Sequence, residues 1–149
     1  MAGSLIKIDE FTVSSGVASV IIGGGTSGSS GLNVSIDSTY DVYMVKYNNV
    51  TPSVDARSIS LRVTKSGTAD ATSNYDYAEK TLKTYNAFEN TGSQNADAWI
   101  LMKQQVGTGT SETANGTIYL YDFNNANEYA FFTMEMVCVD DSQYLHGAQ

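Results

Sequence analysis

Short segments of alternating apolar and polar residues are the dominant pattern of this chain, and they predict β-strands. In residues 58–64, Ile59, Leu61 and Val63 alternate with polar neighbours, which is typical of an antiparallel strand with one buried face. Residues 117–123 alternate in the same way, with aliphatic side chains opposite tyrosines. The pattern therefore predicts a sheet protein in which each strand turns one face towards a core.

Residues 38–50 differ from these segments because both of their faces are apolar or aromatic. In an extended strand, Tyr43 and Val45 would share one face, and Val42 and Met44 would share the other. A strand of this kind is usually covered on both sides, by a second sheet or by a partner chain. We therefore predict that residues 38–50 form the central strand, with which the other strands pair.

The remaining elements are predicted from the same signals. Further strands are expected at residues 4–9, 17–22, 98–102 and 129–139, and polar loops at residues 65–74, 86–97 and 107–116. The last of these loops ends in Asn115-Gly116, a pair that favours a tight turn. Residues 75–85 permit either a helical turn or a strand, and their three tyrosines favour the strand.

Residues 23–31 (GGGTSGSSG) predict a flexible connector. They contain the G-x-G-x-x-G spacing of dinucleotide-binding proteins, but that mechanism needs a helix directly afterwards. Residues 32–36 look extended instead, so we do not predict a nucleotide site.

Strands at this spacing, separated by turns rich in Gly, Asn and Ser, predict an all-β fold. The expected architecture is an antiparallel β-sandwich, jelly-roll-like, with little helix. A chain of 149 residues is long enough to bury a substantial core, so residues 1–149 are expected to form a single domain that includes the connector.

Charge and composition narrow the classes of function. The formal net charge is −8, and Lys and Arg form no cluster for phosphate contacts, so we expect no nucleic-acid binding. No segment approaches the roughly 18 apolar residues of a membrane span, so no membrane insertion is expected. Charged residues make up only 16% of the chain and 10 residues are Tyr, a composition that suits an extracellular or virion surface.

Residues with catalytic or metal-binding chemistry are few. The one histidine, His146, has no second His or Cys at metal-ligand spacing, and no nucleophile motif accompanies it. Cys138 has no partner for an intrachain disulfide and lies in an apolar run, which predicts a buried thiol. The adjacent Asp140 and Asp141 are interpreted as solvated turn charges. We therefore expect no enzymatic activity, no metal and no cofactor.

Four aromatic residues are the remaining candidates for a site: Tyr75, Tyr77, Tyr85 and Trp99. Tyr and Trp are enriched at binding surfaces because they offer a large rigid area with a polar tip. These residues therefore predict either a platform on which sugar rings stack, or a Tyr-rich core or subunit contact. Both interpretations remain open at this point.

Several stretches together resemble a known group of proteins: residues 4–9 (SLIKID), 36–43 (IDSTYDVY), 61–68 (LRVTKSGT), 73–78 (SNYDYA) and 120–126 (LYDFNNA). They are similar to small virion-associated proteins of marine tailed bacteriophages, which are loosely called fibre-like. The resemblance covers nearly the whole chain, but its motifs are structural and carry no catalytic residues. Proteins of this group continue past a Gly-Gly-Gln-like segment, so the resemblance implies closing strands beyond residues 147–149.

This resemblance implies a non-enzymatic virion structural protein, either a tail-fibre or a capsid-decoration component. It further implies a homo-oligomer, with a trimer favoured, that contacts other virion proteins and a host-surface glycan. The location would be the virion, assembled in the host cytoplasm. The alternative function is that of a carbohydrate-binding module, with Trp99 and the tyrosines exposed in one plane.

Overall fold

The computed structural model describes residues 5–23, 31–32, 36–65, 67–125 and 127–149. These residues form strands and no helix, so none of them belongs to a helical segment that could cross a bilayer. The strands are β1 (Ile21–Ile22), β2 (Gly31–Leu32), β3 (Val42–Val50), β4 (Arg57–Leu61), β5 (Thr64–Lys65), β6 (Thr68–Ala69), β7 (Tyr75–Lys83), β8 (Asn86–Ala96), β9 (Trp99–Val106), β10 (Ala114–Tyr121), β11 (Phe131–Val139) and β12 (Leu145–Ala148).

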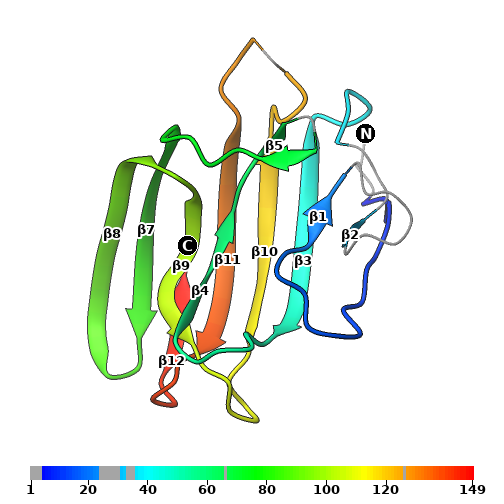
Figure 1. The fold of residues 1–149 in the computed structure, drawn as a ribbon. Coiled ribbons are helices and arrows are strands. Elements are labelled where there is room, and N and C mark those ends of the chain that lie inside the picture. The colour runs from blue at the N-terminus through cyan, green and yellow to red at the C-terminus, as the bar shows by residue number, and fades with distance from the viewer. Residues whose placement is uncertain (1–4, 24–30, 33–35, 66, 126) are drawn as a thin grey trace.

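The main body is a six-stranded sheet with the order β3-β10-β11-β12-β7-β8, in which every neighbouring pair is antiparallel. A second sheet, made of β4 and β9, lies across one face of it (Figure 1). Two further sheets have two strands each, β1 with β2 and β5 with β6. The all-β prediction is therefore confirmed, and the architecture is that of a sandwich-like domain with one large and one small layer.

The core lies between the large sheet and the β4–β9 layer. Its buried members come from both layers and are Leu101, Val106, Ala114, Ile118, Leu120, Met134, Met136, Cys138 and Ala148. Alternation explains the pattern, because every second side chain of a strand points to the same face of the sheet. We call this covered face the inner face, and we call the opposite side of the six-stranded sheet the outer face.

The strand predicted at residues 38–50 exists as β3, but its predicted central position is wrong. β3 is the first strand of the large sheet and pairs with β10 alone in the described ladder. Its inner side chains, Tyr43, Val45 and Tyr47, pack against the core. The outer side chain of Val42 remains 45% exposed. Although both faces of β3 are apolar, the described strands of this chain cover only its inner face.

The polar loop predicted at residues 86–97 is also wrong, because most of it forms β8. The composition of this segment is polar, but β8 pairs with β7 from Tyr75↔Ala96 to Lys83↔Asn86. Cross-strand pairing in the folded sheet overrides weak intrinsic strand propensity. Part of the predicted loop at residues 65–74 likewise contains the short hairpin of β5 and β6.

Asn115 and Gly116 do not form the tight turn that their sequence favours, since both lie inside β10. A Cβ atom at Gly116 would come within 2.5 Å of the Tyr47 hydroxyl oxygen. The glycine therefore permits the Tyr47 ring to lie against the sheet. The side-chain oxygen of Asn115 accepts a hydrogen bond of 2.9 Å from the backbone N–H of Asn49, where the β3–β10 register shifts.

Other predictions had mixed outcomes. The choice of a strand over a helix for residues 75–85 is confirmed by β7, and the strands near residues 58–64, 98–102, 117–123 and 129–139 are confirmed with shifted bounds. Residues 5–9 belong to no strand, and of residues 17–22 only Ile21–Ile22 do, because alternation makes a strand only where a partner strand is in reach. Of the connector predicted at residues 23–31, residues 24–30 lie outside the described part of the chain, and Gly31 belongs to β2.

Candidate functional site

Two of the four predicted aromatic residues lie inside the protein. Tyr75 is 3% exposed and Trp99 is 8% exposed, and their rings meet edge to face with centroids 4.9 Å apart. Trp99 also packs against the rings of Phe123 and Phe132. This aromatic cluster fixes the second layer to the large sheet and offers no free ring face to a sugar.

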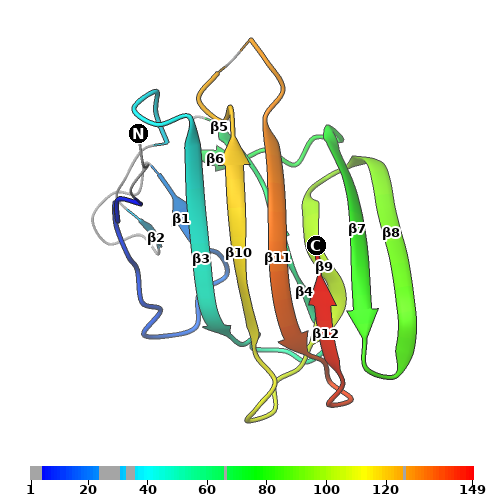
Figure 2. The same cartoon turned by 180° about the vertical axis from the view of Figure 1, so that it is seen from behind.

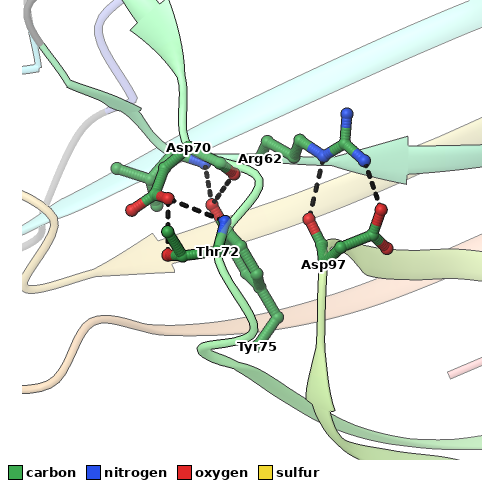
Figure 3. A network of polar contacts seen from close by, with 6 residues as sticks. Arg62, Asp70, Thr72, Tyr75 and Asp97 are labelled. Atoms are coloured by element: carbon green, nitrogen blue, oxygen red, sulfur yellow. Dashed lines mark hydrogen bonds and ion pairs between the residues drawn. The ribbon is translucent and has the colours of Figure 1, made fainter.

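The polar tips of both rings are used within the chain. The hydroxyl of Tyr75 donates to the backbone oxygen of Asp70 at 2.7 Å and accepts from the N–H of Val63 at 3.1 Å, as Figure 3 shows. The indole N–H of Trp99 donates to the backbone oxygen of Asp76 at 3.1 Å. Each buried polar atom thus has a partner, as a structural aromatic residue requires.

The loop before β7 is held by a second set of bonds around Asp70. Its carboxylate accepts from the N–H and the hydroxyl of Thr72 and pairs with Lys65 at 2.6 Å. These contacts, the bond to Lys65 first, lower the pKa of Asp70 from its ordinary value. Nearby, Arg62 donates to both the backbone and the carboxylate of Asp97 (Figure 3). The network fixes the ends of β4 and β7 against β9.

Tyr77 and Tyr85 are not brought to this cluster as a common platform. Tyr77 is half-buried in β7, and Tyr85 follows the opposite end of that strand from Tyr75. Ten residues of extended chain correspond to roughly 33 Å. The ring of Tyr85 lies instead 4.4 Å from that of Tyr144, centroid to centroid. The four aromatic residues therefore do not form one surface.

A buried polar cluster lies where β11, β12 and β7 meet, and the sequence did not predict it. His146 is fully buried, and its Nε2 atom lies 2.8 Å from Oδ2 of Asp140. Glu79 and Thr81 are buried on the adjacent strand, with the Thr81 hydroxyl donating to Glu79 at 2.6 Å. In the described structure, Nδ1 of His146 and Oε2 of Glu79 have no hydrogen-bond partner.

Asp140 is not the solvated turn charge that the sequence suggested, since it is 7% exposed. Burial by itself raises the pKa of Asp140, but hydrogen bonds from the N–H of Tyr144, from His146 and from the N–H of Ser142 outweigh burial and lower it. An Asp two residues before Ser142 is a recognisable turn signal in the sequence. The contact between this carboxylate and His146 has no such signal, because it depends on the pairing of β11 with β12.

This cluster is closed to solvent and has little capacity for chemistry. Cys138 is the cross-strand partner of His146, but burial raises the pKa of its thiol to about 12, so the reactive thiolate is not formed near neutral pH. Among the described residues, no three His, Cys, Asp or Glu side chains converge as metal ligands would. The arrangement acts as a buried polar link between β11, β12 and β7.

The outer face of the large sheet is the candidate functional surface. Figure 2 shows this face with no described strand lying over it. Large apolar side chains on it are between 38% and 63% exposed. They form two groups. The first apolar cluster, at the start of β11, contains Val42, Tyr119 and Phe131, and the second apolar cluster, at the end of β11, contains Val137, Leu145, Leu82 and Phe88.

A row of polar residues separates the two apolar clusters. Strand registers place six residues side by side across all six strands, and we call them the polar row: Lys46, Thr117, Glu135, Gln149, Lys80 and Asn90. Gln149 belongs to this row because its backbone exchanges two hydrogen bonds with that of Lys80. Next to the row, Gly116 and Gly147 contribute to the lining of a shallow depression in the outer face.

Comparison with known proteins adds no relative, because no protein-family model, curated protein or solved structure matches this chain.

Proposed function

We propose that this chain is a non-enzymatic structural protein of a bacteriophage virion, a tail-fibre or capsid-decoration component that acts in particle assembly or host-surface contact. The observation that carries the proposal is the outer face, where seven large apolar side chains on one sheet remain substantially exposed. Contiguous exposed apolar patches on a folded domain mark sites of protein association. The sheet supplies a rigid surface for such a contact.

The position of the titratable residues supports a passive role. His146, Asp140 and Cys138 are all enclosed beneath the sheet, where a substrate would have to unfold the β11–β12 hairpin to reach them. The outer face carries Lys46, Lys80 and Glu135 but no histidine or cysteine, since the single members of each type lie inside. The exposed chemistry is that of a contact surface.

Burial of Tyr75 and Trp99 removes the main support for a carbohydrate-binding module, because sugar stacking needs an exposed ring face. In our proposal, any contact with a host glycan uses other residues. The virion is the proposed location, and other virion proteins and further copies of this chain are the proposed partners.

The test is to detect the chain in purified particles of the phage that encodes it. Mass spectrometry of density-purified virions should find the chain in many copies per particle, and antibodies against it should label the head or the tail in electron micrographs. The major capsid protein gives the reference for copy number. Recovery of the chain solely in the particle-free fraction of the lysate would refute the proposal.

A further inference from the structure

We propose that the outer face is covered by a second copy of this chain, packed face to face about a two-fold axis that runs along β12. This inference rests on the proposed function, because it names the partner of the same surface.

The polar row carries one carboxylate between two ammonium groups. Glu135 lies on β11, with Lys46 two strands away on β3 and Lys80 two strands away on β7. At about 4.8 Å between neighbouring strands, each lysine is roughly 10 Å from Glu135 along the row. All three side chains are exposed, and no described ion pair of this chain includes Glu135.

A two-fold axis that runs along a strand brings the sheets of two copies face to face. Each residue then lies opposite a residue of the other copy that belongs to the same row and lies equally far on the other side of the axis. With the axis along β12, β11 faces β7 of the second copy, so Glu135 lies opposite the partner copy's Lys80, and Lys80 lies opposite its Glu135. The interface is then self-complementary, as a two-fold contact must be. Opposite charges across the contact also disfavour arrangements in which like charges would face each other.

The same axis matches apolar side chains in the neighbouring rows. Val137 on β11 faces Leu82 on β7 of the second copy, because both belong to the row that contains Gly147. Leu145 on β12 lies close to the axis and meets its own counterpart. Gly147, which lines the depression, lets the two sheets approach at the centre.

The size of this contact suits a stable dimer. The axis along β12 superposes five of the six strands, from β10 to β8. Five strands at about 4.8 Å and nine residues, as in β7 and β11, at about 3.3 Å outline a patch of roughly 24 by 30 Å. Because β12 has four residues, about 80 Å² of this outline is not filled by a strand, which leaves about 640 Å². Standard interfaces bury about 800 Å² on each partner. An axis along β10 would also bring opposite charges together, because Lys46 on β3 would face Glu135 on β11 of the second copy. That axis, however, would superpose three strands and not five.

Charge reversal tests the arrangement, with oligomeric state measured by sedimentation velocity. The wild-type chain should be a dimer, and Glu135→Lys and Lys80→Glu should each weaken dimerisation at least tenfold, because like charges then face each other. The double variant E135K/K80E, and a mixture of the two single variants, should dimerise again because opposite charges are restored. Lys46→Glu makes the same charge change on the same face outside the contact, so it should leave the dimer intact.

Other outcomes decide against the inference. A monomeric wild type, a trimer, a failure of the double variant to recover, or an effect of Lys46→Glu as large as that of Lys80→Glu would each overturn it. Thermal melts of all variants establish that each one is folded, which is expected because the three side chains are exposed. A monomer that is nevertheless found in virions would overturn this inference alone, whereas a well-behaved dimer absent from particles would overturn the proposed function alone.

Discussion

Nε2 of His146 and Oδ2 of Asp140 lie 2.8 Å apart in the hairpin that joins β11 to β12, and the imidazole is fully buried. The other carboxylate oxygen of Asp140 accepts from the N–H groups of Ser142 and Tyr144 at 3.0 and 2.8 Å. One side chain thus shapes the turn and also provides a partner for one nitrogen of a buried ring. β12, the last strand in the sequence, depends on this pair for its position in the sheet.

Asp140→Ala should destabilise the fold by about 2–3 kcal/mol, because it leaves two backbone N–H groups and a buried ring nitrogen without their acceptor. Chemical denaturation of the purified chain measures the loss. Asp141→Ala is the matched control, since Asp141 is the exposed neighbour and its replacement should change the free energy of unfolding by less than about 0.5 kcal/mol. Equal effects of the two replacements would contradict the structural role of Asp140.

The contribution of Asp140 should depend on pH. Its pKa is lowered in the folded chain, so its stabilising effect is fully present above the unfolded value of about 3.9 and is lost as the pH falls through the folded value. The difference in free energy of unfolding between the wild type and Asp140→Asn should therefore shrink as the pH is lowered from 6 to 2. A difference that stays constant over this range would show that ionisation of Asp140 contributes nothing.

Gly116→Ala should be destabilising by about 1–3 kcal/mol, since the added methyl group would meet the Tyr47 ring and the backbone oxygen of Glu135 at less than 3 Å. Thermal unfolding followed by circular dichroism measures the shift. Gly16→Ala is the control, because nothing lies within 4 Å of a Cβ atom at that position. If Gly116→Ala melts with the wild type, β3 and β10 do not approach as closely as described.

The single tryptophan reports on the aromatic cluster. Trp99 is buried against Tyr75 and Phe132, so its fluorescence should be blue-shifted and poorly quenched by iodide in the native state. Strong quenching in the native state would restore the sugar-platform hypothesis.

Tyr75→Phe should lower the free energy of unfolding by about 1–2 kcal/mol, because the N–H of Val63 and the backbone oxygen of Asp70 lose a shared partner. Tyr129→Phe, at an 84% exposed position, should be neutral.

Cys138 should resist modification in the native chain. The thiol is 1% exposed, and burial raises its pKa to about 12, so reaction with a disulfide reagent at pH 8 should be at least a hundredfold slower than in denaturant. Spectrophotometric titration of the thiol measures both rates. Rapid native reaction would mean that the β11–β12 hairpin opens readily.

Local sequence patterns predicted several strands because their cause is local. The alternation of Ile118 and Leu120 with Tyr119 requires only that successive side chains of a strand point to opposite faces. The sequence likewise predicted the buried thiol of Cys138 from the apolar run around it. It failed for β8, because the polar residues of this strand are held by pairing with β7, a contact that no local signal encodes.

The candidate surface was only half predictable. The two-sided apolar character of β3 indicated that something must cover Val42 and Met44, but it did not show that none of the described strands of this chain would do so. The polar row required the registers of five strand pairs, which bring residues as distant in sequence as Lys46, Lys80 and Glu135 into one line.

By itself, the sequence determined that this protein is built of strands, and which side chains alternate along each of them, because both properties depend on neighbours a few residues apart. The tertiary structure alone decided that Trp99 is enclosed, that His146 meets Asp140, and that no described strand covers one face of the large sheet. These outcomes depend on strand order and register, which are set by the free energy of packing distant segments together.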